Sequence, residues 1–220
     1  MSKKQLIDKK SLILILIALG LNFGAYYFTR LINRGLVHHD LTGYLDKRIP
    51  LLPCMIVVYL GAYISWAVGF LLLCREKNEI RYEGFAALNI AEILSMIIFI
   101  IFPTEMARPE IIGDGIFEKI TMIIYNLDTP DNLFPSLHCL YNWFFFRISL
   151  KCDKVDKKYR ICTFIMAILV FASTVMVKQH LFMDIIGGII VVEVGMLVAN
   201  KFGLGRIYLA LFSKLENNEE

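Results

Sequence analysis

The sequence lacks a polar stretch long enough to form a separate soluble domain. Of its 220 residues, 57% are hydrophobic and only 20% are charged, and the mean hydropathy is +0.61. A soluble domain of this length would be far more polar, so these values indicate a polytopic membrane protein. We therefore expect a single membrane domain that covers residues 1–220.

Cysteine is too scattered to define a redox or metal framework. The five cysteines form no CxxC pair and no spacing typical of metal ligands. Most lie in or beside apolar runs, where cysteine packs as a small hydrophobic residue, so we expect neither a disulfide framework nor a zinc site.

The adjacent His38, His39 and Asp40 raise a metal hypothesis, but neighbouring residues on a helix do not face one another. We favour an amphipathic interfacial segment there.

Six apolar runs approach or exceed the roughly 20 residues that a helix needs to cross a bilayer. They cover residues 11–27, 51–74, 84–103, 134–150, 161–177 and 183–200. The sequence therefore predicts an all-α fold, a bundle of six transmembrane helices. The first run could pass for a secretory signal, but it ends in Tyr26, Tyr27 and Phe28 rather than in a small-residue cleavage site. This ending favours a retained helix with an aromatic belt.

Positive charge is unevenly distributed over the predicted bundle. With the N-terminus inside, 16 of the 23 lysines and arginines fall in the inner segments and 7 in the outer ones. The positive-inside rule then predicts that both termini are cytoplasmic and that the polar motifs described below share the external face. We interpret the lysine cluster at residues 151–160 as an anchor for anionic lipid headgroups rather than as a nucleic-acid site.

Polar side chains gather in three short segments at the ends of apolar runs. Arg108 follows the third run, Ser136 and His138 open the fourth, and His180 and Asp184 precede or begin the sixth. Phosphoryl transfer from a lipid phosphate needs such a set: one imidazole to attack phosphorus, one to protonate the leaving oxygen, and donors to hold the phosphate.

Each segment has a chemical and a plainer interpretation. His180 and Asp184 are four residues apart, so on a helix they touch, and the carboxylate can fix the imidazole tautomer; alternatively, Asp184 is an ordinary helix-start aspartate. Ser136 precedes a helix start that suits an anion, but it is also a simple capping signal. The planar guanidinium of Arg108 can donate two hydrogen bonds to phosphate oxygens; alternatively, Arg108 only holds the chain at the level of the lipid headgroups.

The long connection at residues 104–133 is the other informative segment. Ile116, Ile120, Ile123 and Ile124 recur at helical spacing and predict a short surface helix. Residues 128–132 have the composition of a turn. A long ordered loop over a membrane bundle is often part of an active site.

In this order the segments resemble the three-motif signature of the type 2 phosphatidic acid phosphatase superfamily, over roughly residues 102–188. Arg108-Pro109 matches part of the first motif, Ser136 and His138 the second, and His180 with Asp184 the third. Two positions depart from the pattern, because Ile101 and Thr174 stand where the family has lysine and arginine. Such losses look similar to the branch of sphingomyelin synthases and inositol phosphorylceramide synthases. Lys178 or Lys119 could supply the missing charge.

The resemblance implies a six-helix bundle and a metal-independent lipid phosphate phosphatase without a cofactor. His180 would form a phosphohistidine and Asp184 would orient it. His138 would protonate the departing alcohol, while Arg108 and Ser136 would bind the phosphate. Lys178, which matches no family motif, is a further candidate for binding the phosphate. One alternative is a phosphotransferase that passes a phospho-headgroup to a lipid or another alcohol. A second is a non-catalytic membrane scaffold or transporter. The expected partner is a phospholipid or lipid phosphate and not a nucleic acid, and the sequence does not define the oligomeric state.

Overall fold

The structure is a computed structural model, and it describes residues 7–217, with side chains to residue 212. Lys3 and Lys4, which belong to the predicted inner charge, lie outside the described residues. The N-terminal part contains α1 (Lys9–Phe23), the π-helix η1 (Gly24–Phe28), α2 (Thr29–Ile32), β1 (His39–Asp40), α3 (Tyr44–Arg48), η2 (Pro53–Met55) and α4 (Ile56–Cys74). The C-terminal part contains α5 (Asn78–Ile101), β2 (Thr104–Glu105), α6 (Ile116–Leu127), α7 (Leu137–Ser149), α8 (Lys157–Met176), α9 (Phe182–Lys201) and α10 (Leu204–Asn217).

Five helical stretches of the described chain are long and apolar enough to cross a bilayer. They are Lys9–Ile32, Pro53–Cys74, Asn78–Ile101, Lys157–Met176 and Phe182–Lys201. The chain is therefore mostly helical, as predicted, and compatible with an integral membrane protein. The run at residues 134–150 gives a shorter helix than expected, because α7 has 13 residues. At about 1.5 Å per residue, α7 is about 20 Å long and does not reach across a hydrocarbon core of about 30 Å.

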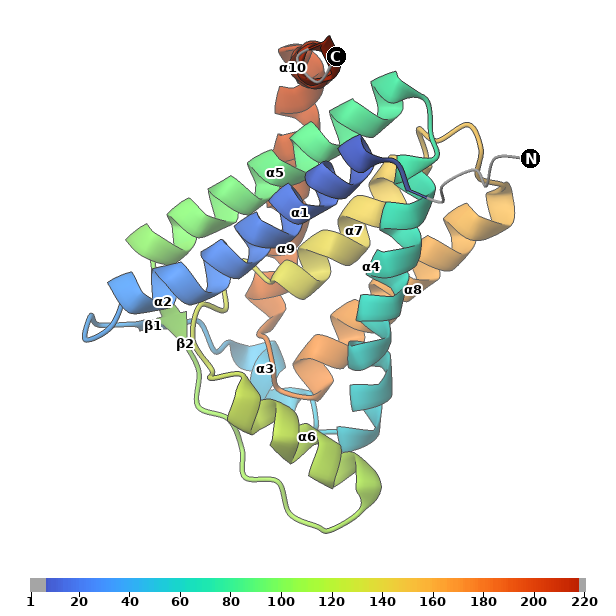
Figure 1. Ribbon diagram of the computed structural model, residues 1–220. Helices are drawn as coiled ribbons and strands as arrows, with labels where there is room; N and C mark the ends of the chain where they lie inside the picture. Colours follow the sequence, from blue (N-terminus) through green and yellow to red (C-terminus); the bar gives the residue numbers. More distant parts are fainter. Residues whose placement is uncertain (1–6, 218–220) are drawn as a thin grey trace.

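The helix α7 lies in the middle of the bundle, where α4, α5, α8 and α9 pack around it (Figure 1). Its inward side chains are at most 2% exposed, and they are Leu140, Tyr141, Phe144, Phe145 and Ile148. In contrast, the outer helices expose large apolar side chains, among them Leu16 at 58%, Ile64 at 71% and Ile165 at 50%. An outer surface of this kind suits a hydrocarbon environment better than water.

Two glycines let α9 approach its neighbours closely. A Cβ atom on Gly195 would lie 2.4 Å from the backbone oxygen of Ala87 in α5. A Cβ atom on Gly188 would lie 2.8 Å from the backbone oxygen of Ser136, at the start of α7. Small residues permit such close packing of membrane helices. They hold α9 against both α5 and the segment that carries His138.

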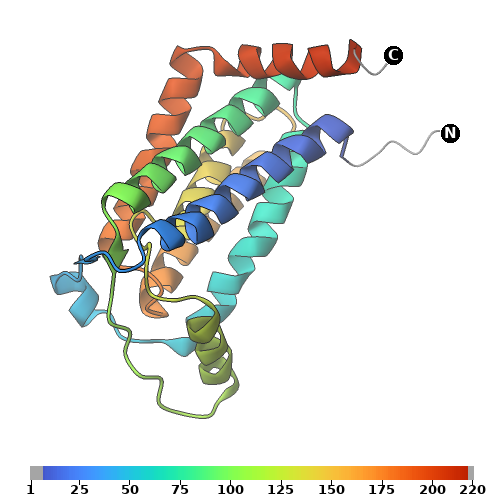
Figure 2. The same cartoon turned by 60° about the vertical axis from the view of Figure 1, so that its left-hand side comes forward.

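The two ends of the bundle differ. At one end lie α6, α3 and the short parallel pair β1–β2, in which His39 pairs with Thr104 and Asp40 with Glu105. At the opposite end, where α1 begins, α10 lies across the bundle (Figure 2). The helix α6 confirms the predicted surface helix. The all-α prediction did not include the two strands, and the interfacial segment expected around His38 is a strand followed by the short helix α3.

Candidate functional site

A pocket of about 300 Å³ opens at the α6 end of the bundle. Its walls come from α1 and η1, from α4, from α6 and the loop after it, from the start of α7 and from the α8–α9 link. The lining residues that matter below are Asn22, Phe23, Tyr26, Tyr27, Tyr59, Tyr63, Trp66, Asp128, Asp131, His138, Gln179 and His180. The pocket therefore brings together segments from both halves of the chain.

His180 is held in one tautomer by two acceptors. Its Nδ1 lies 3.1 Å from the backbone oxygen of Leu133 and 3.2 Å from Oδ2 of Asp184. Since both partners accept hydrogen bonds, Nδ1 carries the proton and Nε2 keeps its lone pair. Asp184 is fully buried, and its Oδ2 also accepts from the backbone N–H of Leu181 at 2.8 Å. The arrangement gives an imidazole with a fixed orientation and a free Nε2.

His138 lies in the same pocket, with its ring centroid 6.2 Å from that of His180. The ring of Tyr59 stacks on it at 4.2 Å, and the Tyr59 hydroxyl is 3.4 Å from Nδ1. The edge of Tyr63 and the ring of Trp66 complete an aromatic surround at 5.4 Å and 5.3 Å. The Tyr59 hydroxyl can donate to Nδ1 of a neutral His138, which places the ring proton on Nε2, or accept from Nδ1 of the imidazolium.

Arg108 does not line the pocket but acts on a residue that does. Its guanidinium donates to Oε1 of Gln179 at 2.6 Å, to the backbone oxygen of Lys178 at 3.2 Å and to the backbone oxygen of Asp128. It also lies 4.6 Å from the centre of the Tyr125 ring. Because Oε1 of Gln179 accepts from Arg108, the amide nitrogen of Gln179 is the group left to interact with a ligand.

Ser136 and Lys178 also lie outside the pocket lining. Ser136 is fully buried, and its hydroxyl caps α7 by accepting from the backbone N–H of Cys139 at 3.3 Å. The Lys178 ammonium donates to the backbone oxygens of Asp46 at 2.9 Å and Ile49 at 2.6 Å, and burial lowers its pKa. The structure thus brings His138, His180 and Asp184 together, and it engages Arg108, Ser136 and Lys178 with groups of the protein itself.

Three nitrogen donors that line the pocket are buried and have no hydrogen-bond partner within the part of the chain that the structure describes. They are Trp66 Nε1, His138 Nε2 and Gln179 Nε2. A buried donor without a partner is costly, and proteins keep few of them. Three such donors around one pocket suit a ligand with several acceptor oxygens.

Two carboxylates, those of Asp128 and Asp131, also line the pocket. Arg30 donates from Nε and Nη2 to Asp131 at 2.8 Å and 2.6 Å, and Tyr26 donates its hydroxyl proton to Asp128. Burial raises the pKa of Asp128 to about 6. Tyr26 belongs to the π-helix η1, and π-helical turns often occur at functional sites.

Sequence reasoning did not identify the aromatic wall on α4. Tyr59, Tyr63 and Trp66 are spaced at i, i+4 and i+7, which places all three on one face of a helix. That spacing was a usable signal, although in an apolar run it usually indicates ordinary packing. Gln179 and Asp128 gave no signal, because each becomes a pocket residue only through contacts with distant segments.

Two glutamates within the long apolar part of the bundle, Glu92 and Glu193, have structural partners. Glu92 accepts from the Tyr141 hydroxyl. Glu193 accepts from Trp143 at 2.8 Å and from Arg147. No group of histidine, cysteine, aspartate or glutamate that could hold a metal ion occurs within residues 7–217.

Comparisons of the chain with models of protein families, with curated proteins and with solved structures find no match.

Proposed function

We propose that the protein is a membrane-embedded lipid phosphate phosphatase that works through a phosphohistidine. The observation that carries this proposal is the pair of imidazoles in one pocket, with His180 fixed by Asp184 and Leu133 and its Nε2 free. Asp184 can stabilise the positive charge that develops on His180 when it attacks phosphorus. The family resemblance, with its incomplete first and third motifs, supports the same assignment.

In the proposed reaction, Nε2 of His180 attacks phosphorus and the bond from phosphorus to the ester oxygen breaks. The departing alkoxide takes a proton from Nε2 of His138, which enters the step as imidazolium with its Nδ1–H donating to the Tyr59 hydroxyl. Water then attacks the phosphohistidine and gives a proton to Nε2 of His138, which restores the imidazolium, while the P–N bond breaks and releases inorganic phosphate and the free imidazole of His180. Gln179 and Trp66 supply N–H donors to the phosphate oxygens. Arg108 acts through Gln179, whose amide it orients.

The phosphotransferase alternative uses the same residues but replaces water with an alcohol. One observation favours it: most of the pocket lining is apolar or aromatic, and its members Phe23, Tyr27 and Tyr63 are exposed. A lipid hydroxyl could reach the phosphohistidine through such a wall more easily than through a polar one. The two reactions differ in their products, because only transfer gives a new phosphodiester lipid.

We further propose six membrane crossings, one of them made by the short helix α7 together with the segment before it, with both termini cytoplasmic and the pocket on the external face. The charge bias in the sequence supports this orientation. The positions of the start of α1 and of α10, at the end of the bundle away from α6, agree with it (Figure 2). Labelling of single cysteines at Asp114 and Lys158 with an impermeant reagent on intact cells tests it, since only the first should react.

The decisive test of the reaction is a lipid screen with the purified full chain in excess chelator, followed by mass spectrometry of products. Release of inorganic phosphate from a phosphatidate-like lipid supports hydrolysis, and a new phosphodiester supports transfer. His180→Ala should abolish both turnover and covalent phosphate. If His180→Ala still acquired phosphate while His138→Ala did not, the two roles would be reversed.

A further inference from the structure

We propose that the face of the bundle where α7 meets α9 binds a second copy of this chain, with the ion pair between Arg147 and Glu193 at the centre of a two-fold interface. This assignment rests on the proposed membrane placement of the bundle and not on the reaction in the pocket. It follows from the exposure of the pair, its depth along the helices and its unused hydrogen-bonding capacity.

Arg147 and Glu193 join two neighbouring helices through two hydrogen bonds. Nε of Arg147 donates to Oε1 of Glu193 at 2.5 Å, and Nη2 donates to Oε2 at 2.9 Å. Nε1 of Trp143 also donates to Oε1, at 2.8 Å. The pair is not sealed inside the bundle, because the side chains of Arg147 and Glu193 remain 33% and 40% exposed. Two opposite charges therefore reach the outer surface.

The pair lies deep in the apolar part of the bundle rather than at its end. Glu193 and Lys201, the last residue of α9, are eight positions apart, which is about 12 Å along the helix axis. Gly195, close to Glu193 on α9, packs on the backbone of Ala87, well inside the apolar span Asn78–Ile101. In a bilayer, the carboxylate would therefore lie inside the hydrocarbon core, which is about 30 Å thick.

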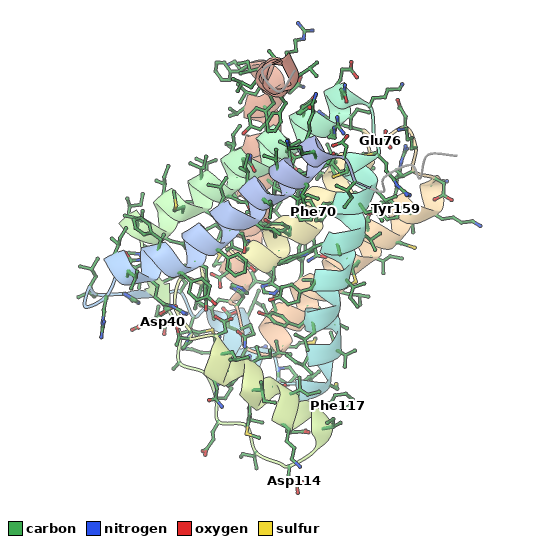
Figure 3. The ribbon with its side chains drawn as sticks, viewed as in Figure 1. Asp40, Phe70, Glu76, Asp114, Phe117 and Tyr159 are labelled. Atoms are coloured by element: carbon green, nitrogen blue, oxygen red, sulfur yellow. The ribbon has the colours of Figure 1, made fainter. Side chains whose placement is uncertain are left out.

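A second exposed ion pair of the chain has different surroundings. Lys77 and Asp153 are 2.7 Å apart, and both side chains are largely exposed. The backbone N–H of Asp153 donates to Glu76, and Glu76 lies at the end of the bundle away from α6 (Figure 3). Water and lipid headgroups can solvate charges at that end. They do not solvate Arg147 and Glu193, because these lie farther along the bundle.

The environment of the pair points to protein on its open side. Ionisable side chains within membrane spans almost always face other protein or a water-filled cavity. The guanidinium of Arg147 has five N–H donors and uses two of them on Glu193. The other three have no partner among the side chains and backbone that the structure describes. Oε2 of Glu193 accepts one hydrogen bond and can accept another. The open side therefore offers both donors and an acceptor.

A two-fold axis along the membrane normal satisfies these groups. Rotation about that axis keeps every residue at its own depth, so the pair of one copy meets the pair of the other. The rotation also exchanges left and right on the facing surfaces. Arg147, on α7, then comes opposite Glu193 of the partner subunit, on α9. The unused N–H groups meet the free lone pair of the partner carboxylate, and four charges neutralise one another.

Other occupants fit this face less well. A lipid phosphate would have to descend about 12 Å below the boundary of the hydrocarbon core to reach the pair. An acyl chain offers no acceptor for an N–H group. Side chains beside the pair also have the character of an interface, since the ring of Phe146 contacts Trp143 at 5.1 Å and the exposed Phe164 at 5.0 Å. Aromatic residues are enriched at the centres of protein interfaces.

Exchanging the two charges tests the interface separately from folding. The double variant Arg147→Glu/Glu193→Arg keeps one ion pair within each copy and the same cross-pairs between like copies. Mixed with the unchanged chain, it would place arginine opposite arginine and glutamate opposite glutamate. The measurement is energy transfer between full chains that carry donor or acceptor fluorescent proteins at the C-terminus, in dilute phosphatidylcholine liposomes. We expect each protein to associate with itself, and the mixed association to be weaker by about tenfold or more.

The exposed pair supplies a matched control. Lys77→Asp/Asp153→Lys exchanges charges in the same way but outside the proposed interface, so this variant should mix freely with the unchanged chain. Phosphate release is measured in the same liposomes. No residue of α8 or α9 lines the pocket, so the exchange at Arg147 and Glu193 should leave turnover within about twofold of the unchanged rate.

Crosslinking tests the same face with the ion pair intact, and so does not depend on whether the exchanged variant folds. Leu197 is exposed on α9, four residues after Glu193, and Ile64 is equally exposed on α4. The background carries Cys54→Ser and Cys162→Ser, which remove the exposed cysteines. In liposomes, a short membrane-permeant bismaleimide should link two copies of the Leu197→Cys variant and not two copies of the Ile64→Cys variant.

Three results would overturn the interface: an unchanged chain that stays monomeric at every lipid-to-protein ratio, free mixing of the exchanged variant with the unchanged chain, or crosslinking at residue 64 and not at 197. Each would leave the proposed phosphatase standing as long as phosphate is released. Selective association without any phosphoryl turnover would instead refute the proposed function and keep the interface.

Discussion

Replacing Asp184 with asparagine tests how the reactive imidazole is held. In most carboxylate–histidine pairs the carboxylate both fixes the tautomer and stabilises the imidazolium. Here the backbone oxygen of Leu133, at 3.1 Å from Nδ1 of His180, is a second acceptor. Asp184→Asn should therefore keep the proton on Nδ1 and lose only the charge. A hydrogen bond to a charged group contributes about 1.5–3 kcal/mol, which corresponds to a loss of roughly 10–150-fold in kcat.

The assay is steady-state phosphate release together with trapping of covalent phosphate, in Asp184→Asn, Asp184→Ala and His180→Ala. We expect Asp184→Asn to retain measurable turnover, Asp184→Ala to be slower and His180→Ala to be inactive. Asp184 also accepts from the N–H of Leu181, so thermal unfolding of each variant must be compared to separate loss of the α9 cap from loss of chemistry. An Asp184→Asn variant as inactive as His180→Ala would show that Leu133 does not hold the tautomer. An unchanged kcat in the Asp184→Asn variant would show that Asp184 only caps α9.

Other predictions concern the leaving group, metals and packing. His138→Ala should slow hydrolysis of alkyl phosphates by about 10²–10⁴-fold but largely spare an aryl phosphate, whose leaving group needs no proton; equal losses on both substrates would argue against a general acid. Activity should be complete in excess chelator, and loss with rescue by one metal would contradict the phosphohistidine route. Arg108→Lys should raise KM more than it lowers kcat, because the amide of Gln179 loses its orientation. In a protein that already carries Gln179→Ala, Arg108→Lys should have no further effect on KM. Gly188→Ala should destabilise the protein by about 1–3 kcal/mol in thermal unfolding, since the new Cβ meets the backbone oxygen of Ser136 at 2.8 Å.

The apolar runs predicted where the helices lie, but not their ends. The helix α5 begins at Asn78 rather than at residue 84, because its first turns are polar and hydropathy does not reveal them. The first run, expected to end at residue 27, continues through η1 to Ile32. The run at residues 134–150 gave the shortest helix of the core, because Ser136 caps it. Hydropathy shows how apolar a segment is, whereas capping and packing determine at which residues its helix begins and ends.

The candidate site could be predicted where its residues interact locally. His180 and Asp184 are four residues apart on the chain, and the structure pairs them. Arg108 was expected to bind phosphate, but nothing in the sequence indicated that its guanidinium would meet three acceptors of the protein. The roles of Gln179 and Asp128 depend on contacts between segments that are distant in sequence. Such contacts follow from tertiary packing and leave no periodic pattern.

The short length of α7 has a consequence for where chemistry takes place relative to the lipid surface. If Ser149 sits at the cytoplasmic boundary, a helix of about 20 Å leaves His138 about 10 Å below the outer boundary of a 30 Å hydrocarbon core. A lipid phosphate normally resides at that boundary, so it would have to sink, or the bilayer would have to thin around the pocket. The donors and charges of the pocket would then replace the headgroup hydration that is lost on the way. Bilayer thickness itself, varied with the acyl length of host lipids, would become a determinant of the catalytic rate.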